Sequence, residues 1–335
     1  MKILLTGGAG FIGSHVATLL STKYPDYSII VLDKMDYCAS EDSLAGCAGG
    51  DNVKLVKGDI QCADLVTHIL EQFAITHVLH FAAQTHVDNS FGNSIAFTMN
   101  NTLGTHVLLE ACRKYGPEKL VKFINVSTDE VYGDTTAHLD SGITEYSTLI
   151  PTNPYSAAKA GAEMLCHAYK TSYNMPIIVT RGNNVYGPGQ FPEKLIPKLI
   201  LLGKLGRPLT IHGDGSARRS YLEVSDVADA FDCILHRGVV GETYNIGTND
   251  ERTVLDIGRE LAERFGVPIV HVRDRAFNDS RYFIASQKLQ DLGWTQRVSW
   301  REGLAETIKW YLAGNAEKRW AAGWESALVP HGGPF

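Results

Sequence analysis

Short apolar runs alternate with longer stretches of helical periodicity through the first half of the chain. The runs are apolar and of strand length, as expected for buried strands of a parallel sheet. They cover residues 2–6, 28–32, 53–56, 76–80, 121–126 and 175–180. Amphipathic or helical stretches between them cover residues 14–21, 100–114 and 155–172. Strands that alternate with helices predict a doubly wound α/β fold, in which right-handed crossovers join a parallel sheet.

The pattern changes after residue 185. Gly187, Pro188, Gly189 and Pro192 break regular structure and predict a loop. Beyond this loop we expect a strand over 242–246 that could rejoin the main sheet, and helices over 195–202, 224–236, 255–265 and 300–312. The sequence therefore predicts a sheet domain of residues 1–185, to which 221–248 could return, and a smaller lobe formed mainly by 186–335.

Composition narrows the class of protein. The 335 residues are 44% hydrophobic and 20% charged, which is ordinary for a globular protein. A formal net charge of -6 argues against a nucleic-acid partner. Six cysteines are scattered without paired spacing, so we expect reduced thiols and no metal site. Strand-like sequence begins at Lys2 and no apolar run approaches a membrane span, which predicts a cytoplasmic protein without a membrane partner.

Three glycines spaced three apart follow the first predicted strand. They are Gly7, Gly10 and Gly13, with Phe11 and Ile12 between the last two. Glycines in such a turn let the backbone approach a pyrophosphate, whose charge then faces the N-terminus of the next helix. A strand before and a helix after them make the pattern typical of a Rossmann dinucleotide-binding domain.

Further residues are candidates for the same cofactor site. Asp33 ends the second predicted strand, twenty residues after Gly13. A carboxylate at this position accepts hydrogen bonds from the ribose hydroxyls and favours NAD over NADP. Lys34 beside it weakens that preference. Asp59 could reach the adenine amine or cap a helix. The remaining candidates follow or flank predicted strands and helices, and are Ile60, Phe81, Ala82, Ala83 and Asn100.

Three polar residues closely follow the predicted strand 121–126. Thr128, Asp129 and Glu130 lie where ligands bind in an open parallel sheet. Tyr155 and Lys159 are four apart on a predicted helix and share a face, and a tyrosine beside a cation becomes a phenolate more readily. Each feature alone could be a solvated turn or a solvated helix face. Combined with the cofactor site, they offer a base for a hydroxyl, an acid for a leaving group and a base for a carbon-bound proton.

The Tyr155 helix also has a recognisable start. Asn153 is a plausible N-cap, and Pro154 occupies the first helical position.

The glycine triplet, the Tyr155/Lys159 pair and the run Arg181-Gly182-Asn183-Asn184-Val185-Tyr186-Gly187-Pro188 together carry a family resemblance. The chain resembles the extended short-chain dehydrogenases/reductases that act on nucleotide sugars, and among them the nucleoside-diphosphate-glucose 4,6-dehydratases. Thr128-Asp129-Glu130 is the most specific motif, because the related 4-epimerases usually lack the two acids. The stretches 81–88, 190–197 and 274–282 point the same way.

The resemblance implies a three-stage reaction with NAD. Tyr155, assisted by Lys159 and Thr128, takes the proton of the glucose C4 hydroxyl while a hydride passes from C4 to NAD. The C4 ketone acidifies the C5 proton, which Glu130 removes, while Asp129 protonates the C6 hydroxyl that leaves as water. The hydride then returns to C6. Tyr155 and Lys159 also count among the cofactor-binding residues.

The resemblance also implies a set of substrate-binding residues. Arg219 and Arg275 are candidates for the diphosphate, although a surface ion pair is the ordinary explanation for either arginine alone. His86 is expected to form hydrogen bonds behind the site rather than to catalyse. The other candidates are Thr128, Asn184, Glu193, Lys194, Leu195, Asn245 and Asn278.

Some positions depart from the bacterial pattern. Residues 220–224 and Asn278 differ from the residues typical of bacterial members. Asn278 and residues 36–40 are more similar to the eukaryotic-type branch, which includes UDP-glucose dehydratases of rhamnose synthesis. We therefore expect UDP-glucose slightly ahead of dTDP-glucose. The helices 100–114 and 155–172 are apolar on more than one face, which predicts a homodimer. The alternatives are a UDP-sugar 4-epimerase and a non-catalytic NAD-sensing protein.

Overall fold

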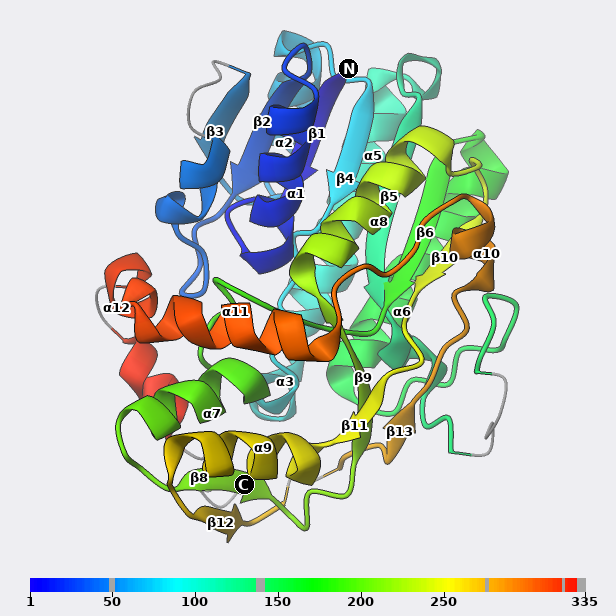
Figure 1. The fold of residues 1–335 in the computed structure, drawn as a ribbon. Coiled ribbons are helices and arrows are strands. Elements are labelled where there is room, and N and C mark those ends of the chain that lie inside the picture. Colours follow the sequence, from blue (N-terminus) through cyan, green and yellow to red (C-terminus); the bar gives the residue numbers. More distant parts are fainter. Residues whose placement is uncertain (48–51, 137–141, 275–276, 321–322, 330–335) are drawn as a thin grey trace.

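The computed structural model describes residues 1–47, 52–136, 142–274, 277–320 and 323–329, and within these segments its centre is a seven-stranded parallel sheet (Figure 1). The strand order is β10-β6-β5-β4-β1-β2-β3. The strands are β1 (Lys2–Thr6), β2 (Ser28–Asp33), β3 (Val53–Lys57), β4 (His77–His80), β5 (Lys122–Thr128), β6 (Ile177–Gly182) and β10 (Thr243–Ile246). The order reverses between β1 and β4, which confirms the predicted doubly wound fold and marks the place where ligands bind.

Helices cover both faces of this sheet. Helices α1 (Phe11–Lys23) and α8 (Val224–Arg237) pack together on one face, around an apolar core that includes Val16, Leu20 and Phe231. On the other face α2 (Ala63–Gln72), α5 (Gly104–Tyr115) and α6 (Pro154–Tyr173) surround a second core. Because both faces are covered, the inner strands are largely buried and apolar, which is the pattern that their sequence shows, whereas the edge strand β3 is only partly buried.

Local sequence explains where the helix of Tyr155 begins. Asn153 Oδ1 accepts from Ser156 N–H at 2.8 Å and the Ser156 side chain bonds back to the Asn153 backbone, so the predicted N-cap is confirmed as a capping box. The helix predicted over 100–114 differs from the structure. It begins with a π-helical turn, η2 (Thr98–Leu103), before α5 starts.

The second half forms a lobe at the carboxyl ends of the main strands, at the bottom of Figure 1. Helices α7 (Leu195–Lys204), α9 (Val254–Phe265) and α11 (Trp300–Leu312) share an apolar core with buried aromatic side chains. The lobe strands are β7 (Asn184–Tyr186), β8 (Leu209–His212), β9 (Arg218–Glu223), β11 (Glu251–Thr253), β12 (Ile269–Val272) and β13 (Arg281–Tyr282). The sequence pattern had not indicated these short strands. β10 leaves the lobe and pairs with β6 in the main sheet.

The remaining elements are short. They are α3 (Val87–Gly92), α4 (Ser94–Phe97), α10 (Gln287–Asp291), α12 (Asn315–Arg319), η1 (Glu41–Cys47), η3 (Pro117–Lys119), η4 (Asp129–Tyr132) and η5 (Trp324–Leu328).

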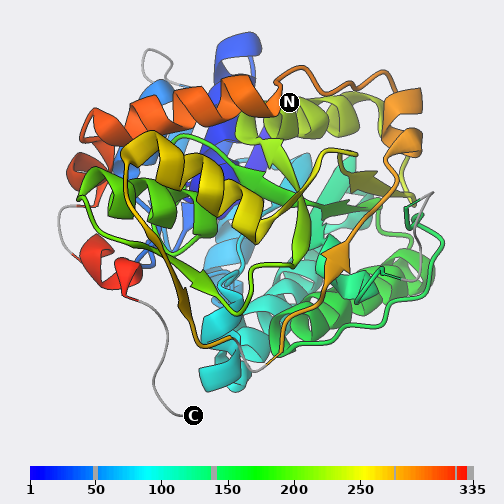
Figure 2. The ribbon, with the colours of Figure 1, turned by 60° about the horizontal axis from the view of Figure 1, so that its bottom comes forward.

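Helices α5 and α6, cyan-green and green, lie at the bottom of the view in Figure 2. Among the described residues, no helix has both the length and the apolar character to cross a membrane. All six cysteines lie in described segments as free thiols.

Candidate active site

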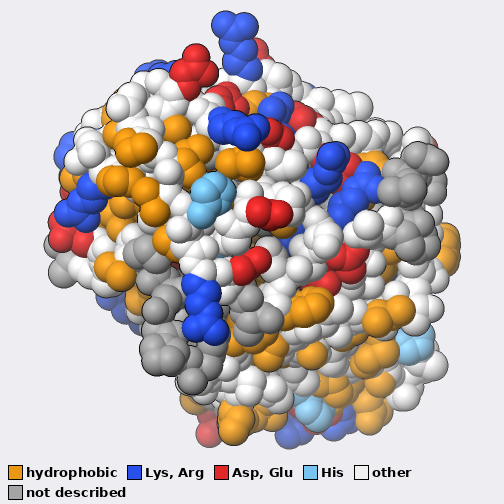
Figure 3. Space-filling model, turned by 90° about the horizontal axis from the view of Figure 1, so that it is seen from below, with side chains coloured by type: hydrophobic (Ala, Val, Ile, Leu, Met, Phe, Trp, Pro, Cys, Tyr) orange, Lys and Arg blue, Asp and Glu red, His pale blue; other side chains and the backbone are white. Residues whose placement is uncertain are grey.

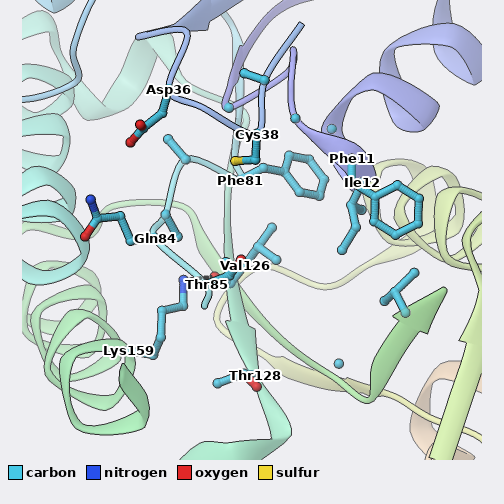
Figure 4. Close-up of a pocket in the computed structure, with 18 of the residues that line it drawn as sticks. Phe11, Ile12, Asp36, Cys38, Phe81, Gln84, Thr85, Val126, Thr128 and Lys159 are labelled. Atoms are coloured by element: carbon cyan, nitrogen blue, oxygen red, sulfur yellow. Dashed lines mark hydrogen bonds between the residues drawn. The ribbon is translucent and has the colours of Figure 1, made fainter. Parts of the chain in front are cut away.

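A cavity of about 310 Å³ opens at the carboxyl ends of the central strands. Every residue predicted to bind the cofactor and every residue predicted to be catalytic contributes to its lining. Figure 4 shows Phe11 and Ile12 at the start of α1, Phe81 after β4, and Thr128 at the end of β5 around this space. Residues from distant parts of the sequence thus meet in one place.

The glycine turn leaves no room for side chains. Gly7 has φ +70°, and a Cβ atom there would lie 2.6 Å from Ala82 N; at Gly13 it would lie 2.5 Å from Gly7 O. Gly10 is the N-cap of α1 and provides no side chain to cap its N–H groups. A bare backbone next to a helix N-terminus fits the pyrophosphate of a dinucleotide, so the residues present suit NAD.

Asp33 is fixed at the end of β2. Its two carboxylate oxygens accept from Ala9 N–H at 3.0 Å and from Met35 N–H at 2.9 Å. Burial raises the pKa of Asp33, while these two N–H groups oppose the rise. Lys34, which had weakened the preference for NAD, forms an ion pair with Asp36 at 3.1 Å and donates to Asn100 Oδ1 at 3.2 Å.

Asp59 closes a turn after β3. Its Oδ1 accepts from Gln61 N–H at 2.9 Å, and the N-cap of α2 is Cys62. The expectation that Asp59 could cap a helix is therefore wrong, because the helix starts later in the chain. Its place in the cavity lining leaves the adenine contact as a prediction.

The acidic pair begins where β5 ends. Thr128 Oγ1 donates to Asp129 Oδ1 at 3.2 Å and accepts from Glu130 N–H at 3.3 Å. Asp129 is buried, and burial raises the pKa of its carboxyl to about 7, with the Glu130 charge adding to the rise. The pKa is lowered in turn by Asn183, Arg219 and Thr128. Asp129 can therefore carry a proton near neutral pH.

Tyr155 and Lys159 lie one turn apart on α6, and both are buried. Lys159 Nζ donates to Val126 O at 2.5 Å, and in Figure 4 its side chain reaches from the helix towards β5, the strand that contains Val126. Burial lowers the pKa of Lys159 to about 8. Burial and then the Glu130 charge raise the pKa of Tyr155 well above 10, while the Thr128 hydroxyl opposes the rise; easing of its ionisation by Lys159 stays a prediction.

Two asparagines contact the acids, and the sequence had not assigned them to the site. Asn183 Nδ2 donates to Asp129 Oδ2 at 2.6 Å. Asn153, predicted only as an N-cap, donates from Nδ2 to Glu130 Oε2 at 3.0 Å. Asparagine in a short loop or at a helix start gives no sequence signal for such a contact, since both positions are common for purely structural reasons.

Three predicted substrate residues besides Thr128 line the cavity, namely Asn184, Glu193 and Lys194. Tyr37 donates to Glu193 Oε2 at 2.6 Å, and Lys194 Nζ donates to Thr85 O at 2.6 Å. These bonds join the loop before α7 to the loops after β2 and β4. The sequence had given no site role to other lining residues, including Tyr37, Cys38, Gln190 and Phe191.

Arg219 lies outside this lining, although it is buried. It donates to Arg218 O, to Asn278 Oδ1 at 2.9 Å and to Asp279 O at 2.8 Å, and it stacks over the Tyr282 ring. Asn278 is thus a partner of Arg219 in this structure. Phosphate binding by Arg219 and nucleotide binding by Asn278 stay predictions.

The other substrate candidates are less well placed. Asn245 was a candidate for a nucleoside or sugar contact, but it is fully buried outside the cavity lining, and its amide bonds to Tyr132, Ile143 and Ala285. That expectation is wrong, because these contacts occupy the side chain. His86 is buried near Asp88, and Leu195 starts α7; neither is part of the lining, although Thr85 and Lys194 beside them are. Arg275 lies outside the described residues.

Charge and metal-binding groups add little to this picture. On the face seen in Figure 3, acidic and basic side chains are interspersed. Within the segments that the structure describes, no group of three or more His, Cys, Asp or Glu side chains could hold a metal ion.

The fold and the site are those of an extended short-chain dehydrogenase/reductase. A family model, GDP-mannose 4,6 dehydratase, matches residues 4–307. A trifunctional UDP-glucose 4,6-dehydratase/UDP-4-keto-6-deoxy-D-glucose 3,5-epimerase/UDP-4-keto-L-rhamnose-reductase of Arabidopsis thaliana is 56% identical, over 98% of this chain and 50% of the relative. The chain thus spans about half the length of that relative. A dTDP-D-glucose 4,6-dehydratase of Dictyostelium discoideum is 45% identical, over 92% of this chain and 81% of the relative.

Solved structures agree with this match. The dTDP-glucose 4,6-dehydratase DesIV of Streptomyces venezuelae, solved with NAD bound, is 37% identical with a TM-score of 0.88, covering 96% of this chain and 99% of that one. The chain belongs to the GDP-mannose 4,6-dehydratase family, and the resemblance inferred from its motifs is confirmed.

Proposed function

We propose that the chain catalyses the NAD-dependent dehydration of a nucleoside-diphosphate glucose to the 4-keto-6-deoxy sugar. The observation that carries this proposal is the adjacent pair Asp129 and Glu130, which lines the same cavity as Tyr155, Lys159 and the glycine turn. An oxidation alone needs no such acid pair. Removal of water requires an acid for the departing oxygen and a base for the neighbouring hydrogen.

The glycine turn and Asp33 would hold NAD, which would supply a reversible hydride acceptor: the hydride of C4 would return to C6 as C5 is reprotonated. Tyr155, with Lys159 and Thr128, takes the proton of the C4 hydroxyl. Glu130 removes the C5 proton, which the C4 ketone has made acidic, and Asp129 protonates the C6 oxygen as it leaves. The pKa of about 7 for Asp129 supports its role as the acid, because this carboxyl can hold and release a proton near neutral pH.

We propose UDP-glucose as the preferred substrate, in a route to a rhamnose-type deoxysugar. The support is that the relative named for UDP-glucose is 56% identical, whereas the relative named for dTDP-glucose is 45% identical. The lobe would bind the nucleotide through residues around Glu193 and Lys194. Residues 1–185 would then serve mainly the cofactor, and 186–335 mainly the nucleotide sugar.

A homodimer is part of the proposal. Ile95, Met99 and Met164 are 75%, 46% and 55% exposed, and they lie on α4, η2 and α6, which pack against one another. An apolar face of this kind is costly in water and suits a second copy of the chain. Light scattering at micromolar concentration should give twice the mass of the 36.7 kDa chain, and a monomer would remove this part of the proposal.

The test is incubation in heavy water with UDP-glucose and dTDP-glucose in separate reactions. A dehydratase should give a 4-keto-6-deoxy sugar with deuterium at C5, and the faster reaction identifies the nucleotide. Interconversion of glucose and galactose without loss of water would instead establish a 4-epimerase. No reaction with either sugar, despite bound NAD, would favour a non-catalytic role.

A further inference from the structure

The amides of Asn183 and Asn153 have a defined orientation. Thr248 N–H donates to Asn183 Oδ1 at 3.1 Å, and Ser156 N–H donates to Asn153 Oδ1 at 2.8 Å. A backbone N–H only donates, so the amide oxygen must face it and the NH₂ group must face the carboxylate. Both side chains are buried, which prevents water from replacing these bonds.

An amide NH₂ group restricts where a carboxyl can hold its proton. NH₂ is only a donor, so it favours the ionised form of the oxygen that it contacts. Asp129 Oδ2 faces Asn183, while Oδ1 faces the Thr128 hydroxyl, which can donate or accept. A proton on Asp129 is therefore directed to Oδ1. On Glu130, the contact from Asn153 to Oε2 favours the charged form that a base requires.

We infer that Asn183 and Asn153 are positioning residues that assign opposite roles to the acid pair, each by donating one amide N–H to its carboxylate. Asn183 opposes the effect that burial has on Asp129, so that Asp129 can still release its proton to the leaving oxygen. Asn153 keeps Glu130 ionised and ties it to the start of the helix that carries Tyr155. This inference rests on the proposed dehydration.

Other charged and titratable groups face the two acids. Asp129 also faces Glu130, Arg219 of β9 and Tyr155 of α6. Glu130 also faces Tyr155 and Tyr282 of β13. These groups are the same in variants of the two asparagines, so changes in the pH profile can be assigned to the amides.

Asn183→Asp and Asn153→Asp are close to isosteric tests. One carboxylate oxygen can still accept the backbone N–H, and aspartate caps a helix as well as asparagine does. The other oxygen replaces a donor by an acceptor beside an acid. Asn183→Asp should move the high-pH limb of dehydration upward by about one to two pH units, because Asp129 then retains its proton longer. Asn153→Asp should move the low-pH limb upward by a similar amount.

Serine variants remove the donor without adding a charge, and Asn153→Ser keeps an N-cap. These serine variants should move the same limbs of the pH profile in the same direction as the aspartate variants do, but by less. A uniform loss of activity at every pH, or movement of the same limb by both sets of variants, would overturn the inference.

A second readout does not depend on turnover. In protein labelled with ¹³C at aspartate carboxyls, the Asp129 signal, assigned with Asp129→Asn, should titrate near pH 7. Asn183→Ser should raise that midpoint, and Asn153→Ser should change it less. If Asn183→Ser fails to fold, Gly247→Ala tests the same amide, since its Cβ would lie 2.8 Å from Asn183 Oδ1.

The two readouts separate the two proposals. A wild-type protein that dehydrates neither sugar, but whose Asp129 midpoint responds to Asn183, refutes the proposed function and leaves the contact. A protein that dehydrates UDP-glucose with an Asp129 midpoint indifferent to Asn183 refutes the inference alone.

Discussion

Replacing Gly7 by alanine should release the cofactor, and Gly206→Ala provides a matched control. Both glycines have a left-handed backbone, with φ of +70° and +65°. A Cβ atom at Gly7 would meet Ala82 N, Ala82 Cα and Phe81 C at 2.6, 2.7 and 2.9 Å, whereas at Gly206 it meets no described heavy atom within 4 Å. The two variants therefore share the backbone strain and differ in the steric clash.

The magnitudes follow from this geometry. Left-handed alanine costs about 1–2 kcal/mol, which should be nearly all of the destabilisation in Gly206→Ala. Gly7→Ala adds overpacking of about 1–3 kcal/mol against backbone that cannot rotate away as a side chain could. Ala82 lines the cofactor cavity, so displacement of its backbone should weaken NAD binding by at least about 10-fold.

The assay is NAD content after dialysis, together with the NAD dissociation constant by calorimetry and thermal unfolding of both variants. Gly206→Ala should lose some stability but bind NAD as the wild type does. Normal NAD binding by Gly7→Ala would refute the proposed role of the glycine turn. So would an equal loss of NAD in both variants, because strain alone would then explain it.

Three further predictions concern the acid pair and a buried ion pair. Glu130→Gln should abolish dehydration but keep C4 oxidation, seen as NADH absorbance, because removal of the Glu130 charge lowers the pKa of Tyr155; near-normal dehydration would refute the role of Glu130. The pKa of Asp129 is raised from 3.8 to about 7, so the folded chain binds this proton more tightly and its contribution to stability falls as pH rises through that window. In urea unfolding, the wild type should therefore lose stability relative to Asp129→Asn as pH rises from about 4 to about 7, and a stability difference that does not change with pH would contradict the raised pKa. Arg181→Met leaves Glu163 buried without its partner at 2.7 Å and should cost about 3–5 kcal/mol in urea unfolding, part of which Glu163→Leu should restore; a cost below about 1 kcal/mol would contradict the pairing.

The sequence predicted the main sheet because its strands are covered on both faces. Such strands are continuous apolar runs, and their order along the chain determines the crossovers. The cavity followed from the same logic, since ligands bind at the carboxyl ends of the strands. The short lobe strands were missed because runs of two to six residues carry little periodicity.

Side-chain partners could not be predicted in this way. Asn183 depends on Thr248, sixty-five residues later in the chain, for the orientation of its amide. Asn245 is polar and lies near the end of a strand, where ligand contacts are common, yet three protein groups take the hydrogen bonds of its side chain. The spacing of Tyr155 and Lys159 placed both on one helix face, but it could not show that Lys159 bonds to Val126 O.

The most direct test of the central claim uses UDP-glucose carrying deuterium at C4. The proposal predicts that the label moves within one turnover to the C6 methyl group of the 4-keto-6-deoxy product, detected by NMR and mass spectrometry. Label released to the solvent, or recovered at C4 of a hexose that has kept its C6 hydroxyl, would contradict it.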